Sequence, residues 1–329
     1  MQKVGVIGAG AWGTALALCA ARAGRDVALW ARDGAATHKM QAARVNETYL
    51  PDILLPENLQ VTADSSALAS CDILLAAIPA QQLVVSLQVL QKYFSRDVPV
   101  VLCAKGIDYQ SGAFLTDQLA AALPAHKIGI LSGPGFAQDV ARGLPVAVTL
   151  AFEDMKLGEK VAQALSSSSF RPYFSTDVRG VEIGGALKNV FAIAAGIVMG
   201  RKLGVSSRAA IVTRSFAEMQ RFGAAFGAKP ETFHGLSGLG DLMLTATSEQ
   251  SRNFRFGFAI GEGVPLAEAK QKLGTVEGIA TAHAARLIAK NKNIEMPITE
   301  TIGSIMDGDE TIDGAIAKLM ARPLKAEGQ

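Results

Sequence analysis

The stretch Val4-Gly5-Val6-Ile7-Gly8-Ala9-Gly10-Ala11-Trp12-Gly13-Thr14-Ala15-Leu16-Ala17 decides the fold of this 329-residue chain. Its apolar start predicts a strand that ends at Ile7, and its Ala- and Leu-rich end predicts a helix that begins near Ala11. Gly8 permits a tight turn between them, Gly10 lets a phosphate group approach the backbone, and Gly13 lets helix and strand pack closely. The first turn of the helix adds free N–H donors. In this strand–turn–helix context, the three glycines predict the nicotinamide dinucleotide site of a Rossmann-type domain.

The first half of the chain alternates apolar runs with helical patterns, as such a domain requires. Two of the runs, 73–78 and 100–104, are continuously apolar, which is typical of strands that helices cover on both faces. The pattern therefore predicts a doubly wound, largely parallel sheet. Its expected strands are Lys3–Ile7, Asp26–Trp30, Leu59–Thr62, Asp72–Ile78, Val98–Ala104, Lys127–Leu131, Ala147–Ala151 and Arg171–Phe174.

Helical patterns take over downstream of residues 177–181, where extended apolar runs become rare. We therefore place a domain boundary near residue 179. Residues 1–179 are predicted to form an α/β Rossmann-like NAD(P)-binding domain, and residues 180–329 an all-helical domain that binds substrate and carries the catalytic groups. The expected helices of the second domain are Glu182–Met199, Ser207–Phe226, Pro265–Leu273, Thr281–Ala289 and Thr299–Met306.

Composition indicates a globular protein of the cytoplasm. The net charge is only +2 and 49% of the residues are apolar, which gives no support to a nucleic-acid or membrane-surface partner. The three cysteines lie in apolar runs without CxxC spacing, which favours buried thiols in a reducing compartment. Four histidines without an HExxH pattern predict no metal site.

Neither a signal peptide nor a membrane-spanning helix is expected. The chain passes directly from Met1-Gln2-Lys3 into the first strand. The stretch 73–91 lacks formal charges, but it contains Pro79 and four glutamines. A spanning helix needs about 20 predominantly apolar residues, so this stretch is better explained as a buried strand followed by a helix.

The end of the second expected strand bears on the choice of cofactor. An NAD-selective site usually places Asp or Glu about 20 residues beyond the glycines, on the ribose hydroxyls. Here the strand ends in Trp30-Ala31-Arg32, and Asp33 follows one residue later. Arg32 could pair with a 2′-phosphate, which favours NADP over NAD. The alternative is that Arg32 is a solvated loop cation.

Ligands of open α/β sheets bind beyond the carboxyl ends of the strands. The polar or glycine-rich segments at those ends are Pro79, Lys105-Gly106, and Ser132-Gly133-Pro134-Gly135-Phe136-Ala137. Lys105 follows five apolar residues directly, which places a cation at the edge of the sheet. A surface lysine that starts a turn would give the same pattern.

A second lysine lies within an almost entirely apolar helix. On the expected helix, Lys188 has Gly184, Gly185, Phe191 and Ala192 as neighbours three and four positions away. Small residues on this face leave room beside the amine. An ammonium group in such surroundings must find a partner or lose its proton, which favours an acid/base role over a lysine that extends to the surface.

Two polar groups follow in the second half. Asp241 stands between the glycine-rich segment 235–240 and an apolar run, where it could cap a helix or lie near Lys188. Ser251, Arg252 and Asn253 form a compact set of donors suited to an anion, because the planar guanidinium matches phosphate geometry. The alternative for this set is a solvated helix start.

Taken together, these motifs resemble the NAD(P)-dependent glycerol-3-phosphate dehydrogenases of the bacterial type. The resemblance covers almost the whole chain and implies a 6-phosphogluconate-dehydrogenase-like fold. It is carried by the segments Gly-Ala-Gly-Ala-Trp-Gly-Thr-Ala-Leu-Ala (8–17), Ala-Lys-Gly (104–106), Ser-Gly-Pro-Gly-Phe-Ala (132–137), Gly-Gly-Ala-Leu-Lys-Asn-Val (184–190), Gly-Leu-Gly-Asp-Leu (238–242), Gln-Ser-Arg-Asn (250–253), Val-Glu-Gly (276–278) and Met-Pro-Ile-Thr (296–299).

The resemblance implies roles for the matching residues. Lys188 would exchange the proton with the substrate oxygen, and Lys105 and Asp241 would line the substrate site. The other substrate contacts would be Gly133, Gly135, Ser251, Arg252 and Asn253. The cofactor contacts would be Gly8, Gly10, Ala11, Trp12, Gly13, Arg32, Tyr49, Lys105, Ala137, Arg252, Thr275 and Glu277.

Two positions depart from the family pattern. Ala11 stands where family members often carry Ser, and Gly135 stands where they usually carry Ser or Thr. Each departure removes one hydroxyl, near the pyrophosphate and near the substrate respectively. Because the acid/base and phosphate groups remain, we expect altered affinity rather than altered chemistry.

The activity implied is the reversible reduction of dihydroxyacetone phosphate to sn-glycerol 3-phosphate for glycerophospholipid synthesis, by a cytoplasmic homodimer. Two alternatives fit parts of the same pattern. A related two-domain dehydrogenase could act on a 3-hydroxy acid or its thioester, but it would need no phosphate clamp at Arg252. A non-catalytic NAD(P) sensor would have no use for Lys188 and Asp241.

Overall fold

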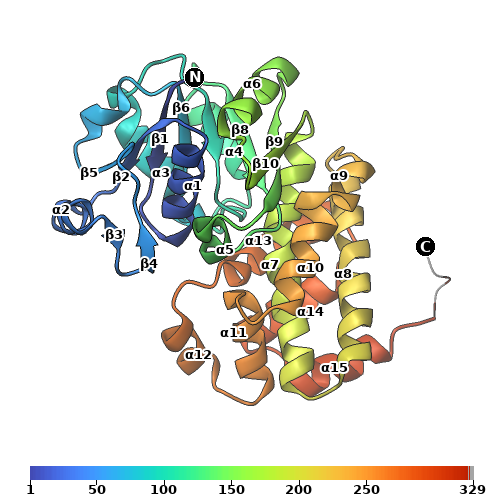
Figure 1. Ribbon diagram of the computed structural model, residues 1–329. Coiled ribbons are helices and arrows are strands. Elements are labelled where there is room, and N and C mark those ends of the chain that lie inside the picture. Colours follow the sequence, from blue (N-terminus) through green and yellow to red (C-terminus); the bar gives the residue numbers. More distant parts are fainter. Residues whose placement is uncertain (325, 327–329) are drawn as a thin grey trace.

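The computed structural model describes residues 1–324 and residue 326, and it shows an α/β half followed by an all-helical half (Figure 1). The α/β half is built on one eight-stranded sheet with the spatial order β10-β9-β8-β7-β6-β1-β2-β5. All neighbouring strands are parallel except β8 and β9. The strands are β1 (Lys3–Ile7), β2 (Asp26–Trp30), β5 (Leu59–Thr62), β6 (Ile73–Ala76), β7 (Val100–Leu102), β8 (Ile128–Ser132), β9 (Val146–Phe152) and β10 (Phe170–Ser175).

Helices cover both faces of this sheet, as the continuously apolar strands predicted. One face packs against α1 (Ala11–Arg22), α5 (Ala137–Arg142) and α6 (Met155–Leu165), and the other against α3 (Ala80–Leu90) and α4 (Leu115–Ala122). Every residue of β6 and β7 is buried. The stretch 73–91 divides into β6 and α3, as expected, although β6 and β7 are shorter than the apolar runs that contain them.

A small hairpin that the sequence did not predict closes over the glycine turn. It consists of β3 (Val45–Asn46) and β4 (Leu50–Leu54) and follows α2 (Gly34–Ala43). The Asn46 amide donates to the carbonyl of Ala9 at 3.0 Å and to the hydroxyl of Thr14 at 2.8 Å. These two contacts join residues that are more than thirty positions apart in the sequence. The hydrophobic pattern of the hairpin itself therefore does not predict it.

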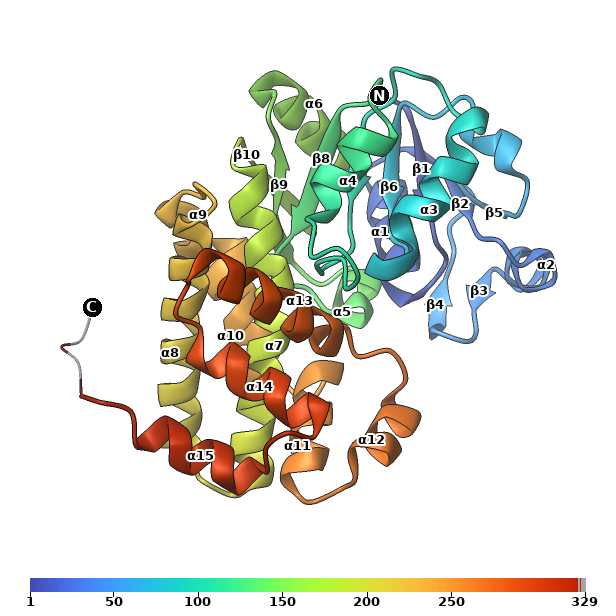
Figure 2. The same cartoon turned by 180° about the vertical axis from the view of Figure 1, so that it is seen from behind.

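The helical half is arranged around α7, which runs from Val178 to Gly200 (Figures 1 and 2). The Asp177 side chain starts this helix by accepting a hydrogen bond from the Gly180 N–H at 2.9 Å. Residue 179, the predicted domain boundary, therefore lies in its first turn. The other helices are α8 (Val205–Ala224), α9 (Pro230–His234), α10 (Asp241–Thr247), α11 (Arg252–Gly261), α12 (Leu266–Leu273), α13 (Glu277–Lys292), α14 (Pro297–Asp307) and α15 (Ile312–Met320).

Glycines allow α7 to approach α11 until their backbones touch. A Cβ atom on Gly196 would lie 2.1 Å from the Phe254 carbonyl oxygen, and one on Gly257 would lie 2.0 Å from that of Ile193. Larger residues here would push the two helices apart. This close packing fixes the start of α11, which carries Arg252, relative to Lys188 on α7.

By length and composition, α7 is also the one helix in the described part of the chain that could cross a membrane. In the fold, however, 94% of its most apolar window is buried in protein. An apolar helix so enclosed is typical of the core of a soluble protein.

We expect Gly13→Ala to lower the free energy of unfolding by about 2 kcal/mol, because overpacking a rigid contact costs that order of energy. The added Cβ would lie 1.8 Å from the carbonyl oxygen of Gly8, which belongs to the turn itself. Urea unfolding without cofactor measures the loss. Gly10→Ala is the matched control, since nothing lies within 4 Å of its added Cβ. Equal losses in the two variants would contradict this account of the turn.

Candidate active site

Two lysines meet one buried aspartate where the two halves of the chain join. Lys105 follows β7, Lys188 lies in the middle of α7, and Asp241 is the first residue of α10. The Lys105 Nζ is 2.6 Å from Asp241 Oδ2, and the Lys188 Nζ is 2.7 Å from Asp241 Oδ1. Asp241 is 1% exposed and makes no capping bond to α10. The Asp241 carboxylate therefore pairs with the two lysines and does not cap the helix.

Burial and charge together set the ionisation of this cluster. Burial, and to a lesser degree Lys105, lower the pKa of Lys188, whereas Asp241 raises it, and the net result is a pKa of about 8. Burial alone would raise the pKa of Asp241, but Lys105 and Lys188 hold it below its ordinary value. Lys188 can consequently give up or take back a proton near neutral pH while Asp241 stays charged.

Thr245 completes the surroundings of Lys188, and the sequence analysis did not single it out. Its hydroxyl accepts a hydrogen bond from the Lys188 Nζ at 2.7 Å and lies 3.2 Å from Asp241 Oδ1. The available signal was its spacing, because residues 241 and 245 share one face of a helix. Lys188 thus has two oxygen partners on α10, which fix the direction of its ammonium group.

Lys105 faces the segment that follows β8. Its Nζ donates to the Gly133 carbonyl at 3.1 Å and lies 5.8 Å from the centre of the Trp12 ring. Gly133 has φ +144°, and a Cβ there would lie 2.9 Å from the Val148 backbone. At Gly135, a Cβ would lie 3.3 Å from a methyl group of Val146 and 3.6 Å from the Trp12 ring. Gly133 therefore contacts Lys105 through its backbone alone, and Gly135 adds no side chain beside the Trp12 ring.

The glycine turn has the features that a pyrophosphate needs. Gly8 has φ +109°, and nothing lies within 4 Å of a Cβ built on Gly10, so the backbone there is open. No side chain caps α1, which begins at Ala11 and leaves its first N–H groups free for an anion. The indole N–H of Trp12 is enclosed and has no hydrogen-bond partner among the described residues. These residues fit a dinucleotide.

Arg32 and Asp33, which follow the carboxyl end of β2, have different surroundings. The Asp33 carboxylate caps α2 by accepting from the Ala36 N–H at 3.0 Å. Arg32 is exposed, as is Tyr49 in the β3–β4 hairpin with 55% of its surface accessible. One oxygen of the carboxylate that made the choice of cofactor ambiguous is therefore engaged as a helix cap.

The start of α11 meets the start of α13. Arg252 is exposed and donates to the Thr275 carbonyl at 3.4 Å, while the Ser251 hydroxyl caps α11 by accepting from the Phe254 N–H. Asn253 is buried, accepts from the Gly278 N–H at 3.0 Å and donates to Asn189 at 2.9 Å. Asn253 therefore joins the start of α13 to Asn189, the neighbour of Lys188 on α7.

Glu277 begins α13 and is partly buried. Burial raises the pKa of this carboxyl group, while Arg252, Lys188 and Lys105 act to lower it. The Ala80 N–H, at the start of α3, also donates to it. Glu277 therefore connects the helical half to the α/β half beside the lysine cluster.

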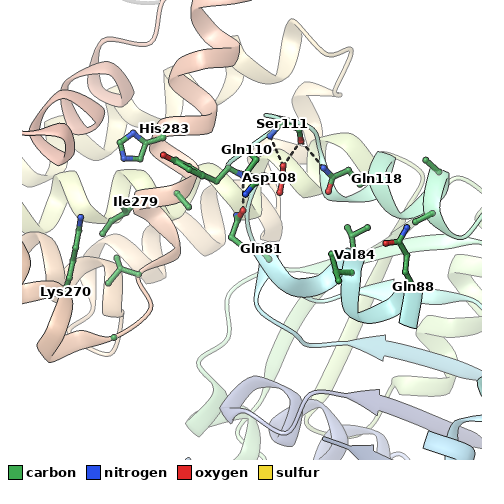
Figure 3. A pocket seen from close by; sticks show the side chains of 18 residues that line it. Gln81, Val84, Gln88, Asp108, Gln110, Ser111, Gln118, Lys270, Ile279 and His283 are labelled. Atoms are coloured by element: carbon green, nitrogen blue, oxygen red, sulfur yellow. Dashed lines mark hydrogen bonds between the residues drawn. The ribbon is translucent and has the colours of Figure 1, made fainter. Parts of the chain in front are cut away.

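A hollow of about 1190 Å³ opens between α3 and α4 on one side and α12 and α13 on the other (Figure 3). Gln81 and Val84 of α3 lie across it from Ile279 and His283 of α13. None of the three charged residues of the lysine–aspartate cluster lines it. The hollow is thus a separate feature of the junction. Among the described residues, no group of three His, Cys, Asp or Glu side chains is placed to hold a metal ion.

Family models match both halves of the chain. The model described as NAD-dependent glycerol-3-phosphate dehydrogenase N-terminus covers residues 3–158, and the corresponding C-terminus model covers residues 177–317. The chain belongs to the NAD-dependent glycerol-3-phosphate dehydrogenase family. This confirms the family that the sequence motifs predicted.

Glycerol-3-phosphate dehydrogenases of known sequence and structure resemble the chain over its full length. A protein of Azorhizobium caulinodans with the name glycerol-3-phosphate dehydrogenase (NAD(P)+) is 53% identical over 326 residues, covering 99% of this chain and 98% of its own. One of Caulobacter vibrioides with the same name is 48% identical over 327 residues, covering 99% of each. The crystal structure of glycerol-3-phosphate dehydrogenase from Coxiella burnetii superposes with a TM-score of 0.93 at 37% identity, over 98% of this chain and 99% of that one.

We expect Asp241→Asn to lower the free energy of unfolding by about 3 kcal/mol at about pH 6, because the substitution leaves the buried ammonium groups of Lys105 and Lys188 without their carboxylate. Without Asp241 the pKa of Lys188 falls below 8. The loss of unfolding free energy relative to wild type should therefore shrink as the pH rises toward about 8. At that pH, Lys188 of the folded variant is already neutral and no longer needs a charged partner. Urea unfolding at several pH values measures this loss.

The control for this variant is Asp313→Asn, which removes an exposed ion pair with Arg201. Its expected cost is below about 1 kcal/mol, because surface pairs contribute little. A deficit in Asp241→Asn that is as small as that of the control, at every pH, would contradict the electrostatic account of the cluster.

Proposed function

We propose that the chain catalyses the reversible reduction of dihydroxyacetone phosphate to sn-glycerol 3-phosphate with NADPH or NADH. Family membership over the full length supports the reaction. The observation that carries the chemistry is the buried Lys188 amine, held between Asp241 and Thr245 with a pKa of about 8. A ketone reduction needs such a proton donor beside the carbonyl oxygen.

In the proposed mechanism, a nicotinamide cofactor held by the glycine turn would supply the hydride for C2 of the ketone. The Lys188 ammonium gives its proton to the carbonyl oxygen as negative charge develops there, and the neutral amine takes a proton back from solvent afterwards. Lys105 adds a second positive charge near that oxygen. Asp241 keeps both amines directed at the same point through its two carboxylate oxygens. In the oxidation direction, the neutral Lys188 amine accepts the hydroxyl proton.

The start of α11 is the proposed phosphate site. Arg252 makes a single 3.4 Å bond to Thr275, so most guanidinium donors stay available. The Ser251 hydroxyl accepts from a backbone N–H but keeps its own proton to donate. Asn253 uses Oδ1 and one N–H within the protein, which leaves one N–H for substrate. Gly133 and Gly135 would line the opposite side with backbone groups.

Binding of the phosphate at α11 places the reacting carbonyl at a fixed distance from Lys188. Remote binding energy of this kind is spent on orientation at the reacting centre. A 3-hydroxy acid or thioester would leave the Arg252 donors unused. The phosphate site therefore supports dihydroxyacetone phosphate over that alternative.

The cofactor would lie along the glycine turn and across the junction. Gly8, Gly10, Ala11 and Gly13 would hold the pyrophosphate, and Lys105 and Arg252 would reach the cofactor from the substrate side. The remaining proposed contacts are Trp12, Arg32, Tyr49, Ala137, Thr275 and Glu277. We propose a preference for NADP, which the exposed Arg32 and the capping role of Asp33 support.

The proposed reaction also bears on the metabolic role, location and assembly of the enzyme. Its product is the backbone of glycerophospholipids, so we propose a role in their synthesis. Three buried free cysteines support a cytoplasmic location. A homodimer is the assembly that the family resemblance implies. The division of labour, with cofactor bound by residues 1–179 and substrate by residues 180–329, is supported by the place of Lys188, Asp241 and Arg252 on helices of the second half.

Lys188→Ala should lower kcat for dihydroxyacetone phosphate by about 1000-fold, because a positioned proton donor contributes on this scale. Binding of NADPH, followed by fluorescence titration, should stay near the wild-type value, since the glycine turn is intact. Lys156→Ala, on the exposed side of α6, is the matched control and should keep full activity. Near-normal kcat in Lys188→Ala would overturn the assignment.

The pH profile of the wild-type enzyme provides a second check of the same residue. Because the pKa of Lys188 is about 8, kcat/KM for reduction should fall as the pH rises through that value, when the proton donor is lost. For oxidation, kcat/KM should fall as the pH drops through it. Both limbs should be missing from the residual activity of Lys188→Ala.

Arg32→Ala should raise KM for NADPH by on the order of 10-fold or more, because a charge-assisted bond contributes about 1.5–3 kcal/mol. KM for NADH should change by less than about 2-fold, since NADH lacks the 2′-phosphate. Steady-state kinetics with both cofactors makes the comparison within one protein. An equal effect on the two cofactors would show that Arg32 does not select the phosphate.

A further inference from the structure

The lysine–aspartate cluster is assembled from two halves of the chain. Lys105 belongs to the α/β half, whereas Lys188 and Asp241 belong to the helical half. The 2.6 Å contact between Lys105 and Asp241 therefore depends on how the segment after β7 is held against α7. A misplacement of about 1 Å at a reacting centre can lower a rate by about 100-fold. Contacts that fix this segment should therefore affect the rate of the proposed reaction.

The segment 105–114 folds back on itself, so that its last residue pairs with a residue near its start. Ile107 and Phe114 form an isolated antiparallel bridge, so the residues just after Lys105 are paired with the residue just before α4. Gln81 of α3 bonds the same turn, accepting from the Tyr109 N–H at 2.9 Å and donating to the Ile107 carbonyl at 2.9 Å. The turn is therefore stiff, and a displacement at the start of α4 is passed to Lys105.

A buried carboxylate of α7 holds the start of α4. Glu182 is 2% exposed and lies six residues before Lys188 on the same helix. Its Oε1 accepts from the Thr116 N–H at 3.0 Å, and its Oε2 accepts from the Thr116 hydroxyl at 2.5 Å. Arg179 donates to Glu182 at 3.1 Å and to Asp117 at 2.5 Å. We call Glu182, Arg179, Thr116 and Asp117 the Glu182 clamp.

We propose that Glu182 is a positioning residue for the reaction: by holding Thr116, it fixes the segment 105–114 against α7 and sets where Lys105 meets Asp241. The inference rests on the proposed roles of Lys105 and Lys188. The clamp does not touch the glycine turn, so it acts on the lysine cluster and leaves dinucleotide binding at the turn unaffected.

The chain contains a second arrangement of the same kind that serves as a control. Glu218 of α8 is 1% exposed and accepts from the Thr299 N–H at 3.1 Å and from its hydroxyl at 2.9 Å. It therefore holds the start of α14 as Glu182 holds the start of α4. Both partners of this second arrangement lie within the helical half, and the hydrogen bonds between them involve no residue of the segment 105–114.

The test compares Thr116→Val with Thr299→Val, each of which removes one buried hydroxyl bond to a glutamate. Both should lower the melting temperature. Only Thr116→Val should lower kcat/KM for dihydroxyacetone phosphate, by on the order of 10-fold per folded molecule, with KM for NADPH within about 2-fold of wild type. Thr116→Ser, which restores the hydroxyl, should recover most of the activity.

A second measurement is independent of turnover. Lys105 lowers the pKa of Lys188, which also faces Asp241 and Glu277. If Thr116→Val moves Lys105 away, the pKa of Lys188 should rise above 8, and competitive labelling of Lys188 with acetic anhydride across pH detects that rise. Thr299→Val should leave this pKa unchanged. If Thr116→Val does not fold, Glu182→Gln against Glu218→Gln makes the same comparison.

Equal kcat/KM and equal Lys188 pKa in the two threonine variants would overturn the positioning role and reduce the clamp to a structural contact. Failure of the proposed function has a different signature, namely no oxidation of NADPH or NADH by the wild-type protein in the presence of dihydroxyacetone phosphate. The pKa readout decides the clamp in either case, because it does not require the reaction.

Discussion

The structure depends on one buried carboxylate that two ammonium groups share. Asp241 is almost fully enclosed, and a charge in such a place is tolerated only with close partners. Lys105 and Lys188 supply them from opposite halves of the chain, so the cluster also joins those halves. With both lysines protonated, the three residues Lys105, Lys188 and Asp241 carry a net positive charge among themselves. That surplus suits a phosphorylated ketone whose carbonyl oxygen becomes negative during reduction.

Helix α7 is the scaffold on which this arrangement is built. It carries Glu182 near its start and Lys188 in its middle, while Gly196 near its end lets α11 approach to backbone contact. One apolar, buried helix thus fixes Lys188, the proposed proton donor, relative to both the proposed phosphate site on α11 and the segment that carries Lys105. Burial of the helix also lowers the pKa of Lys188, so its packing and its chemistry have the same physical origin.

Much of the fold and the candidate site could be predicted because the signals are local. Continuously apolar runs predicted β6 and β7, and the polar residues at the ends of strands predicted Lys105. Other features depend on contacts between distant segments, and the spacing of Thr245 from Asp241 was the one local signal among them. The β3–β4 hairpin depends on the Asn46 bonds to the glycine turn, and Thr245 and Glu182 act through partners far away in sequence. A polar side chain on a helix predicts nothing about its partner until the helices are packed.

The sequence by itself determined the glycine turn, because the positive φ of Gly8 and the lack of space for a Cβ at Gly13 require glycine at those positions. It likewise determined that Lys188 stands in an apolar helix and needs a partner. Only the tertiary structure decided that the partner is Asp241, that Lys105 shares it, and that Asp33 caps a helix. The reason is that pairing energies of charges depend on distance and burial, and both arise only when distant segments pack together.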